Sequence, residues 1–215
     1  PAPRITVVGE GEMAASPDMA ILSLSVLREA DTARAALDQD NKAMADVIDA
    51  MKKAGIAERD LQTSGLSIDP RYSTVKPDGK PQEEPKIIGY RALNSLTVRV
   101  RDLGKLGAII DKSVSLGVNQ GGDITFTNDD MSKPMEEARK RAMLDAIARA
   151  RTLTEAAGVK TGKILDISEQ SYRLMPRPMA MKARSFAAAA EDSVPVQAGE
   201  NTYHATVTVT FEIEQ

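Results

Sequence analysis

The sequence predicts an α+β fold made of two βαββ repeats, with antiparallel sheets and with the helices packed on one face. The main observation is a strand pattern that occurs twice, at 203–213 and at 90–100. In both stretches apolar and polar residues alternate, which is the period of a half-buried strand. Aligned, the two copies share their apolar positions, except that Asn94 stands where the later copy has Val207. A chain that repeats a strand in this way is expected to be built from repeated units.

The ends of two helical stretches also match. Lys-Ala-Gly-Ile at 53–56 ends one helical pattern, and Ala-Ala-Gly-Val at 156–159 ends another. Each is followed by an extended segment that ends near a tyrosine, Tyr72 or Tyr172. The order strand, helix, strand, strand therefore occurs twice, and the last two strands of each repeat are expected to form a hairpin.

We therefore expect a single domain over 1–215. Its first βαββ unit covers about 18–101, its second covers about 121–214, and a helix at 102–116 joins them. In each unit the helix would cover one face of the sheet and leave strand edges unpaired. Unpaired edges can pair with another chain.

The chain begins with a predicted strand at 4–11 that runs into a glycine-containing turn. Gly9 and Gly11, followed by Ala14, resemble a dinucleotide-binding fingerprint. Such a site needs a helix that starts at the second glycine. Here acidic residues would face the phosphates, and Ser16-Pro17 would break the helix. We expect a turn or bulge at this point, and no cofactor.

In the first unit an alternating strand after Pro17 leads to a helix. Asp31 is expected to cap this helix, which runs to about Ala54. Gly55 would end it in a left-handed conformation.

An extended segment at 60–72 follows, and its Leu66 and Ile68 are expected to point inward. Prolines, a glycine and charged residues at 74–86 predict an exposed hairpin tip. The segment 87–101 then returns as the first copy of the repeated strand.

A shorter helix, capped by Asp102 and ended by Gly117, connects the units, and a brief strand at 121–127 opens the second. The apolar stripe of the connecting helix is expected to contain Leu103, Leu106, Ile110 and Val114.

The longest helix is expected to start at Ser132 and to stop at Gly158. An extended segment at 163–172 follows it. The packed face of this helix is mostly small and would let it lie close on a sheet; it comprises Ala138, Ala142, Ala146, Ala150 and then Leu153.

Composition narrows the classes of function. The net charge of −3 and the pI near 5.4 argue against a nucleic-acid partner, which would require a basic surface. No apolar run is long enough for a transmembrane helix. Cysteine is absent, so disulfides and thiolate chemistry are excluded. A chain that starts at Pro1 is expected to be a mature form without its signal peptide, or a trimmed one.

Few residues are suited to catalysis. His204 is the single histidine, and the strand period places it on the polar face, so a zinc site or a Ser-His-Asp triad is not expected. Asp123, Asp129 and Asp130 lack the spacing of a calcium loop, and the last two are interpreted as helix-entry residues. We expect a protein that is not an enzyme, with no cofactor and no metal.

The loop at 174–200 is unusually long for a compact domain, which is typical of a functional or a disordered segment. Its methionines could bind copper(I), be oxidised reversibly to sulfoxides, or pack into a neighbouring subunit. The candidate oligomer or partner contacts are Met175, Pro176, Arg177, Pro178, Met179, Met181 and Phe186.

Several motifs occur in a characteristic order, at 9–11, 17–20, 89–103, 119–120 and 156–168. None of them is chemically diagnostic, and the specificity of a match lies in their order. In this order the chain resembles the SIMPL-domain family of bacterial cell-envelope proteins over nearly its whole length.

This resemblance implies an exported protein, located in the periplasm or at the outer membrane and linked to oxidative-stress tolerance. It also implies an α+β subunit that forms large ring- or channel-like homo-oligomers, and it supplies no catalytic residues. We expect the loops at 73–86 and 174–199 to contribute to the contacts between subunits. The alternative is a periplasmic binding module for a peptide, a lipid fragment or copper(I). An enzyme ranks third and would require a carboxyl pair with shifted pKa values in a cleft.

Overall fold

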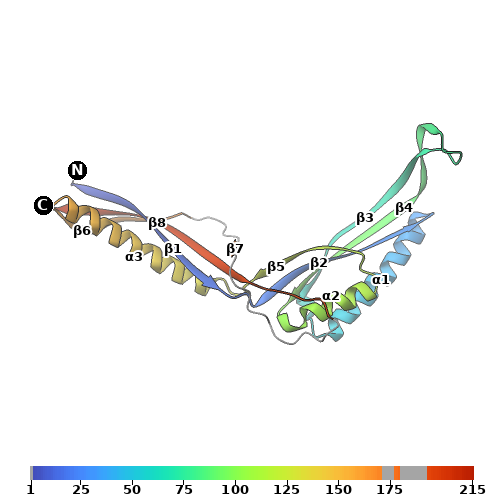
Figure 1. Cartoon of the computed structure of the whole chain (residues 1–215), viewed down its shortest axis with the longest axis horizontal. Helices are drawn as coiled ribbons and strands as arrows, with labels where there is room; N and C mark the ends of the chain where they lie inside the picture. The colour runs from blue at the N-terminus through green and yellow to red at the C-terminus, as the bar shows by residue number, and fades with distance from the viewer. Residues whose placement is uncertain (1, 171–176, 180–192) are drawn as a thin grey trace. The chain divides into compact units, whose positions relative to one another are not determined.

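The computed structural model describes residues 2–170, 177–179 and 193–215. The chain forms two compact units, each with its own sheet and core (Figure 1). The central unit contains the described residues of 18–126 and 185–197. The terminal unit contains those of 1–17, 127–184 and 198–215.

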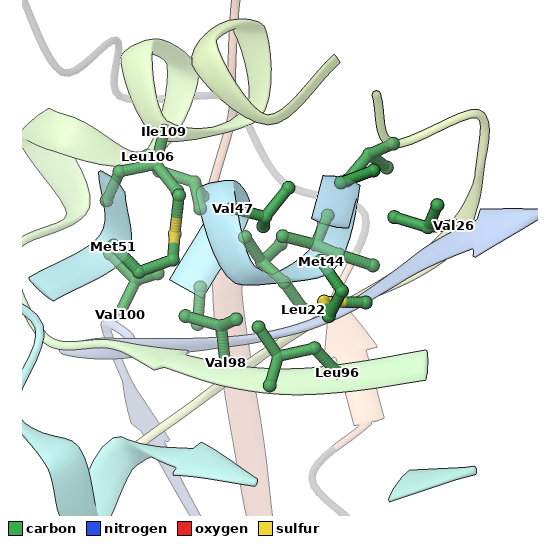
Figure 2. Close-up of a cluster of buried hydrophobic side chains, with 14 residues drawn as sticks. Leu22, Val26, Met44, Val47, Met51, Leu96, Val98, Val100, Leu106 and Ile109 are labelled. Carbon is green, nitrogen blue, oxygen red and sulfur yellow. The ribbon is translucent and has the colours of Figure 1, made fainter. Parts of the chain in front are cut away.

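The central unit has a sheet in the order β3-β4-β2-β5. Its helices and strands are β2 (Met19–Ala30), α1 (Ala33–Lys53), β3 (Leu61–Val75), β4 (Pro81–Val100), α2 (Leu106–Ser115) and β5 (Gln120–Thr127), with short 3-10 turns at Glu58–Asp60 and Leu103–Lys105. Helix α1 packs on β2 and β4, and Figure 2 shows the side chains of these elements meeting those of α2. Burial of each such Leu, Val or Met contributes roughly 1.5–3 kcal/mol.

The ends of α1 follow from local chemistry. The Thr32 hydroxyl oxygen accepts a hydrogen bond from the N–H of Ala35 at 3.1 Å, so the cap is Thr32 and the prediction of Asp31 was wrong by one residue. At the other end Gly55 has a φ of 92°, which confirms the predicted left-handed stop.

Strand β3 corrects a prediction about burial. Leu66 is 60% exposed and Ile68 is 42% exposed, although both were expected to point inward. The reason is that α1 covers β2 and β4, whereas β3 lies at the margin of the sheet, and the β3–β4 hairpin extends beyond the helix (Figure 1).

The connecting helix differs slightly from its prediction. Asp102 does act as a cap, because its Oδ1 accepts from the N–H of Gly104, but it caps a 3-10 turn that precedes α2. Val114, expected on the buried stripe, is 60% exposed, and Ile109 and Ser113 are buried instead.

The terminal unit has a sheet in the order β1-β8-β6, with the short β7 also paired with β8. Its elements are β1 (Arg4–Ala15), α3 (Ser132–Ala156), β6 (Lys160–Glu169), β7 (Arg177–Met179) and β8 (Glu200–Glu214). Helix α3 packs on β1 and β8, and it starts at Ser132 as predicted. Its four predicted alanines are fully buried, whereas Leu153 is 54% exposed and Thr154 takes its place.

Gly9 and Gly11 lie in the middle of β1, so the prediction of a turn at this point was wrong. A Cβ on Gly9 would lie 2.1 Å from the carbonyl oxygen of Ala142, and one on Gly11 would lie 2.1 Å from that of Ala138. The glycines are needed because the helix backbone lies against the strand.

The pairing of strands also corrects one assignment. The strand at 121–127 was assigned to the second repeat, but β5 pairs with β2, and β1 takes the corresponding position beside β8. With this exchange the two units match, since the order β3-β4-β2 corresponds to β6-β8-β1. The predicted α+β class with antiparallel sheets is confirmed. The description of 1–215 as one domain, with a helix at 102–116 joining two units, stays a prediction.

Candidate interaction surfaces

His204 lies on the polar face of β8, as predicted. Its Nδ1 is 3.4 Å from Oε1 of Glu12, and its Nε2 is 3.3 Å from the hydroxyl oxygen of Thr206. In space, these three side chains are arranged in the order carboxylate, imidazole, hydroxyl, as in a catalytic triad. However, the side chains of His204 and Glu12 are 41% and 64% exposed. Water therefore screens this pair, whereas the aspartate of a catalytic triad is buried. We assign no catalytic role to it.

Asp40 on α1 is the one carboxyl group of the described residues that is fully enclosed. Neither of its oxygens has a hydrogen-bond partner in the described part of the chain. Burial raises the pKa of Asp40 to about 6, and the positive charge of Arg28 on β2 opposes this shift. The guanidinium of Arg28 donates its hydrogen bonds to the carbonyl oxygens of Leu27 and Gly117.

The sequence analysis missed Asp40, although a signal was present. Asp40 precedes Met44, Val47 and Met51 at helical spacing, which places a carboxyl group on the apolar stripe of α1. A lone carboxyl beside an arginine is not the paired arrangement that would favour acid–base catalysis.

Exposed apolar side chains gather on the β3–β4 hairpin. Tyr72 and Ile87 are opposite each other in the pairing of β3 with β4, and they are 57% and 51% exposed. Ile88, at the register shift beside this pair, is also 51% exposed. Large apolar side chains in such numbers are typical of a surface that another molecule covers. The set is Leu66, Ile68, Tyr72, Val75, Ile87 and Ile88.

The candidate contact residues of the long loop are only partly described. Arg177, Pro178 and Met179 form β7, which pairs with Glu200–Thr202 of β8. Met175, Pro176, Met181 and Phe186 lie outside the described residues. The role of these seven residues in contacts stays a prediction.

Two strand edges are covered by side chains. On β1, the carboxylate of Asp145 accepts from the N–H of Glu10 at 2.8 Å, and Arg141 donates to the carbonyl oxygen of Glu12 at 2.8 Å. On β2, the side-chain amide of Asn119 both accepts from the N–H of Leu27 and donates to its carbonyl oxygen. These contacts satisfy backbone groups that would otherwise be able to pair with another strand.

An open groove lies between α2 and β5 in the central unit. Its volume is about 400 Å³. We call it the β5–α2 groove; its apolar lining includes Leu22, Leu24, Ile110, Val114 and Ile124, together with Gly122.

No group of three or more His, Asp or Glu side chains in the described ranges is arranged to hold a metal ion. No helix within these ranges is long and apolar enough to cross a membrane.

The fold and surfaces define an α+β protein of two βαββ units with exposed strand edges. The pattern of the SIMPL family, described as a protein of unknown function (DUF541), matches residues 5–211. The chain belongs to this family.

Named relatives agree with this assignment. The chain is 57% identical over 214 residues to the 26 kDa periplasmic immunogenic protein of Brucella melitensis, a match that covers 98% of this chain and 85% of the relative. It is 30% identical over 190 residues to the uncharacterized protein YggE of Edwardsiella ictaluri, covering 87% of this chain and 75% of the relative. The chain is also 27% identical over 218 residues to the uncharacterized protein YggE of Escherichia coli K12, a match that covers 99% of this chain and 84% of the relative.

These relatives place the protein in the periplasm, as an exported protein of the cell envelope. Their names describe immunogenic or uncharacterized proteins and do not describe enzymes.

Proposed function

We propose that this protein is a non-enzymatic component of the cell envelope that assembles with itself into a large ring- or channel-like homo-oligomer. Its role in the cell is tolerance of oxidative stress. One observation carries this proposal, namely the apolar surface of the β3–β4 hairpin beyond the cover of α1.

The physical reason is the cost of leaving this surface in water. Each side chain of the Tyr72–Ile87 pair is more than half exposed, and burial against a second copy would remove that area from solvent. Strand β3 is also the last strand of its sheet, so backbone groups along its outer edge can pair with another chain. Contacts between different surfaces of identical subunits close into rings when the rotation between subunits permits.

The proposal is tested by the native mass in solution, measured by light scattering on a sizing column over a range of protein concentrations. We expect a mass many times 23.1 kDa that survives dilution. The double variant Tyr72→Ser/Ile87→Ser is expected to reduce this mass while leaving the circular dichroism spectrum unchanged, because both side chains lie outside the core.

A matched control is Leu144→Ser on α3, which removes an equally exposed apolar side chain from the other unit. This variant should keep the native mass. A wild-type mass equal to one chain would overturn the assembly, and an unchanged mass of the double variant would remove the hairpin from it.

The stress role is tested in the same variants. A strain that carries only the double variant is expected to lose survival in peroxide, as a strain without the protein does, whereas the Leu144→Ser strain survives. Full survival of the double-variant strain would separate assembly from stress tolerance.

A further inference from the structure

The β5–α2 groove has features of a binding site for an extended chain. It is apolar, and two of its lining side chains are well exposed, Val114 at 60% and Ile124 at 41%. Its volume of about 400 Å³ is at the lower end of the roughly 300–1,000 Å³ of small-molecule sites. A groove of this size accommodates a few apolar side chains.

Gly122 lies in the lining of this groove. Phe126 packs against the central core, so the alternation of a strand places Ile124 and Gly122 on the same side, toward α2. A Cβ built on Gly122 would meet no atom within 4 Å. Close packing therefore does not require glycine here, in contrast to Gly9 and Gly11.

Strand β5 is the last strand on its side of the sheet. Within the part of the chain that the structure describes, no strand pairs with its outer edge. The edge of β1 differs, because side chains of Asp145 and Arg141 cover it. Within the described part of the chain, no such side-chain hydrogen bond reaches residues 121–124 of β5.

The charge at this site also selects an occupant. Asp123 is the one charged residue among those that line the groove, and no ion pair of its carboxylate occurs among the described residues. A basic side chain of a bound segment could pair with it.

We propose that β5 and α2 form a docking site for an extended segment of a partner protein. The segment adds a strand to the outer edge of β5, places apolar side chains from alternate positions in the groove, and carries a lysine or arginine near Asp123. Backbone pairing supplies affinity and the groove supplies selectivity, as in other cases of strand addition. A lipid chain could fill the groove, but it would leave the backbone groups of β5 unpaired.

The test uses a short fluorescein-labelled peptide in which valine alternates with threonine and one threonine is replaced by lysine. Its binding to the full chain is measured by fluorescence anisotropy. Gly122→Val places a side chain in the groove, at a position where a Cβ meets no atom within 4 Å, and is expected to weaken binding by about tenfold or more. Gly65→Val is the control, because it adds the same side chain to an exposed position of β3 outside the groove, and it should leave binding within about twofold.

A second peptide with the same side chains but with methylated backbone nitrogens separates strand addition from apolar contact. It is expected not to bind. Should Gly122→Val disturb the circular dichroism spectrum, Val114→Asp replaces it, with Leu144→Asp on α3 as its control; the first should abolish binding and the second should not.

Three results would overturn the proposal. One is absence of peptide binding to the wild-type chain. Another is equal binding of the methylated peptide, which would leave a purely apolar site. The third is a fall in native mass in Gly122→Val without peptide binding to wild type, which would assign the groove to a second copy of this chain. None of these results depends on the outcome of the hairpin variants described above.

Discussion

Asp40 is an ionisable group within an apolar layer of α1. Its carboxyl is fully enclosed among side chains of the central unit, and Arg28 is the charged group that acts on it from the strands beneath. The guanidinium of Arg28 is bonded to carbonyl oxygens and does not bond to the carboxyl. The protonated form of Asp40 therefore fits the folded state better than the ionised form.

The consequence is a dependence of stability on pH. Because the pKa of Asp40 is about 6 in the folded state and 3.8 ordinarily, the folded state binds the proton more tightly. Stability gained from this proton is fully present below pH 3.8 and is lost as the pH rises through 6. With this difference in pKa, ionisation of Asp40 lowers the free energy of unfolding at pH 7 by about 3 kcal/mol.

Asp40→Asn removes the charge and keeps the shape. We expect this variant to be more stable than wild type at pH 7.5, by about 1–3 kcal/mol, and nearly equal to it at pH 4. The free energy of unfolding in urea at both pH values measures the effect. Asp46→Asn, at an exposed position of the same helix, should show no such difference. An equal effect of Asp40→Asn at both pH values would show that Asp40 does not titrate as described.

At the scale of elements, the contact of α3 with β1 depends on the absence of side-chain atoms. Alanines on the helix face glycines on the strand, so the backbones approach closely. The same closeness lets Asp145 and Arg141 reach the backbone of β1 and cover its edge. One packing solution thus stabilises the terminal unit and also protects a strand from pairing.

Gly11→Ala tests this contact. Its new Cβ would lie 2.1 Å from the carbonyl oxygen of Ala138 and 2.3 Å from the nitrogen of Ala142, so α3 must move. We expect a loss of about 1–3 kcal/mol or more in the free energy of unfolding. Gly65→Ala in β3 is the control, since its Cβ would find ordinary contacts at 3.8 Å, and it should be neutral. Equal stability of Gly11→Ala and wild type would contradict the close contact.

At the scale of the whole molecule, the family match extends from 5 to 211 and includes both βαββ units. Both units also carry exposed large apolar side chains, on the β3–β4 hairpin of the central unit and on β6 and α3 of the terminal unit. Contacts between two different surfaces of identical subunits are the kind that rings require.

The long loop gives a prediction at this scale. Deletion of 176–190, which removes most of the candidate contact residues, is expected to reduce the native mass measured by light scattering. The deletion ends before the described residues that contact α2, including Val196 in the central core. An unchanged native mass would exclude the loop from the assembly and leave the hairpin as its main contact.

Several features could be predicted because they depend on neighbours in the chain. The alternation at 203–213 predicts a strand with one buried face, and Gly55 predicts a left-handed helix end. The occurrence of this strand pattern at both 90–100 and 203–213 predicts two units with the same architecture. The Ala138, Ala142 and Ala146 stripe predicts close helix packing, which the structure confirms.

Other features depend on contacts between distant segments, which local pattern does not contain. Alternation along the strand would bury Leu66, but its side chain is exposed because α1 packs mainly on β2 and β4 and not on this part of β3. The pairing of β5 with β2 places it outside the second repeat. Asn119 has an ordinary polar side chain whose role in covering β2 appears only in the fold.

The sequence by itself determined the class of fold, the two repeats, the stop of α1 at Gly55 and the start of α3 at Ser132, because periodicity and capping act within a few residues. Only the tertiary structure decided which strand completes each sheet, why Gly9 and Gly11 are glycines, and that Asp40 is buried. These depend on which surfaces meet in space, and the energy of such contacts is set by residues far apart in the chain.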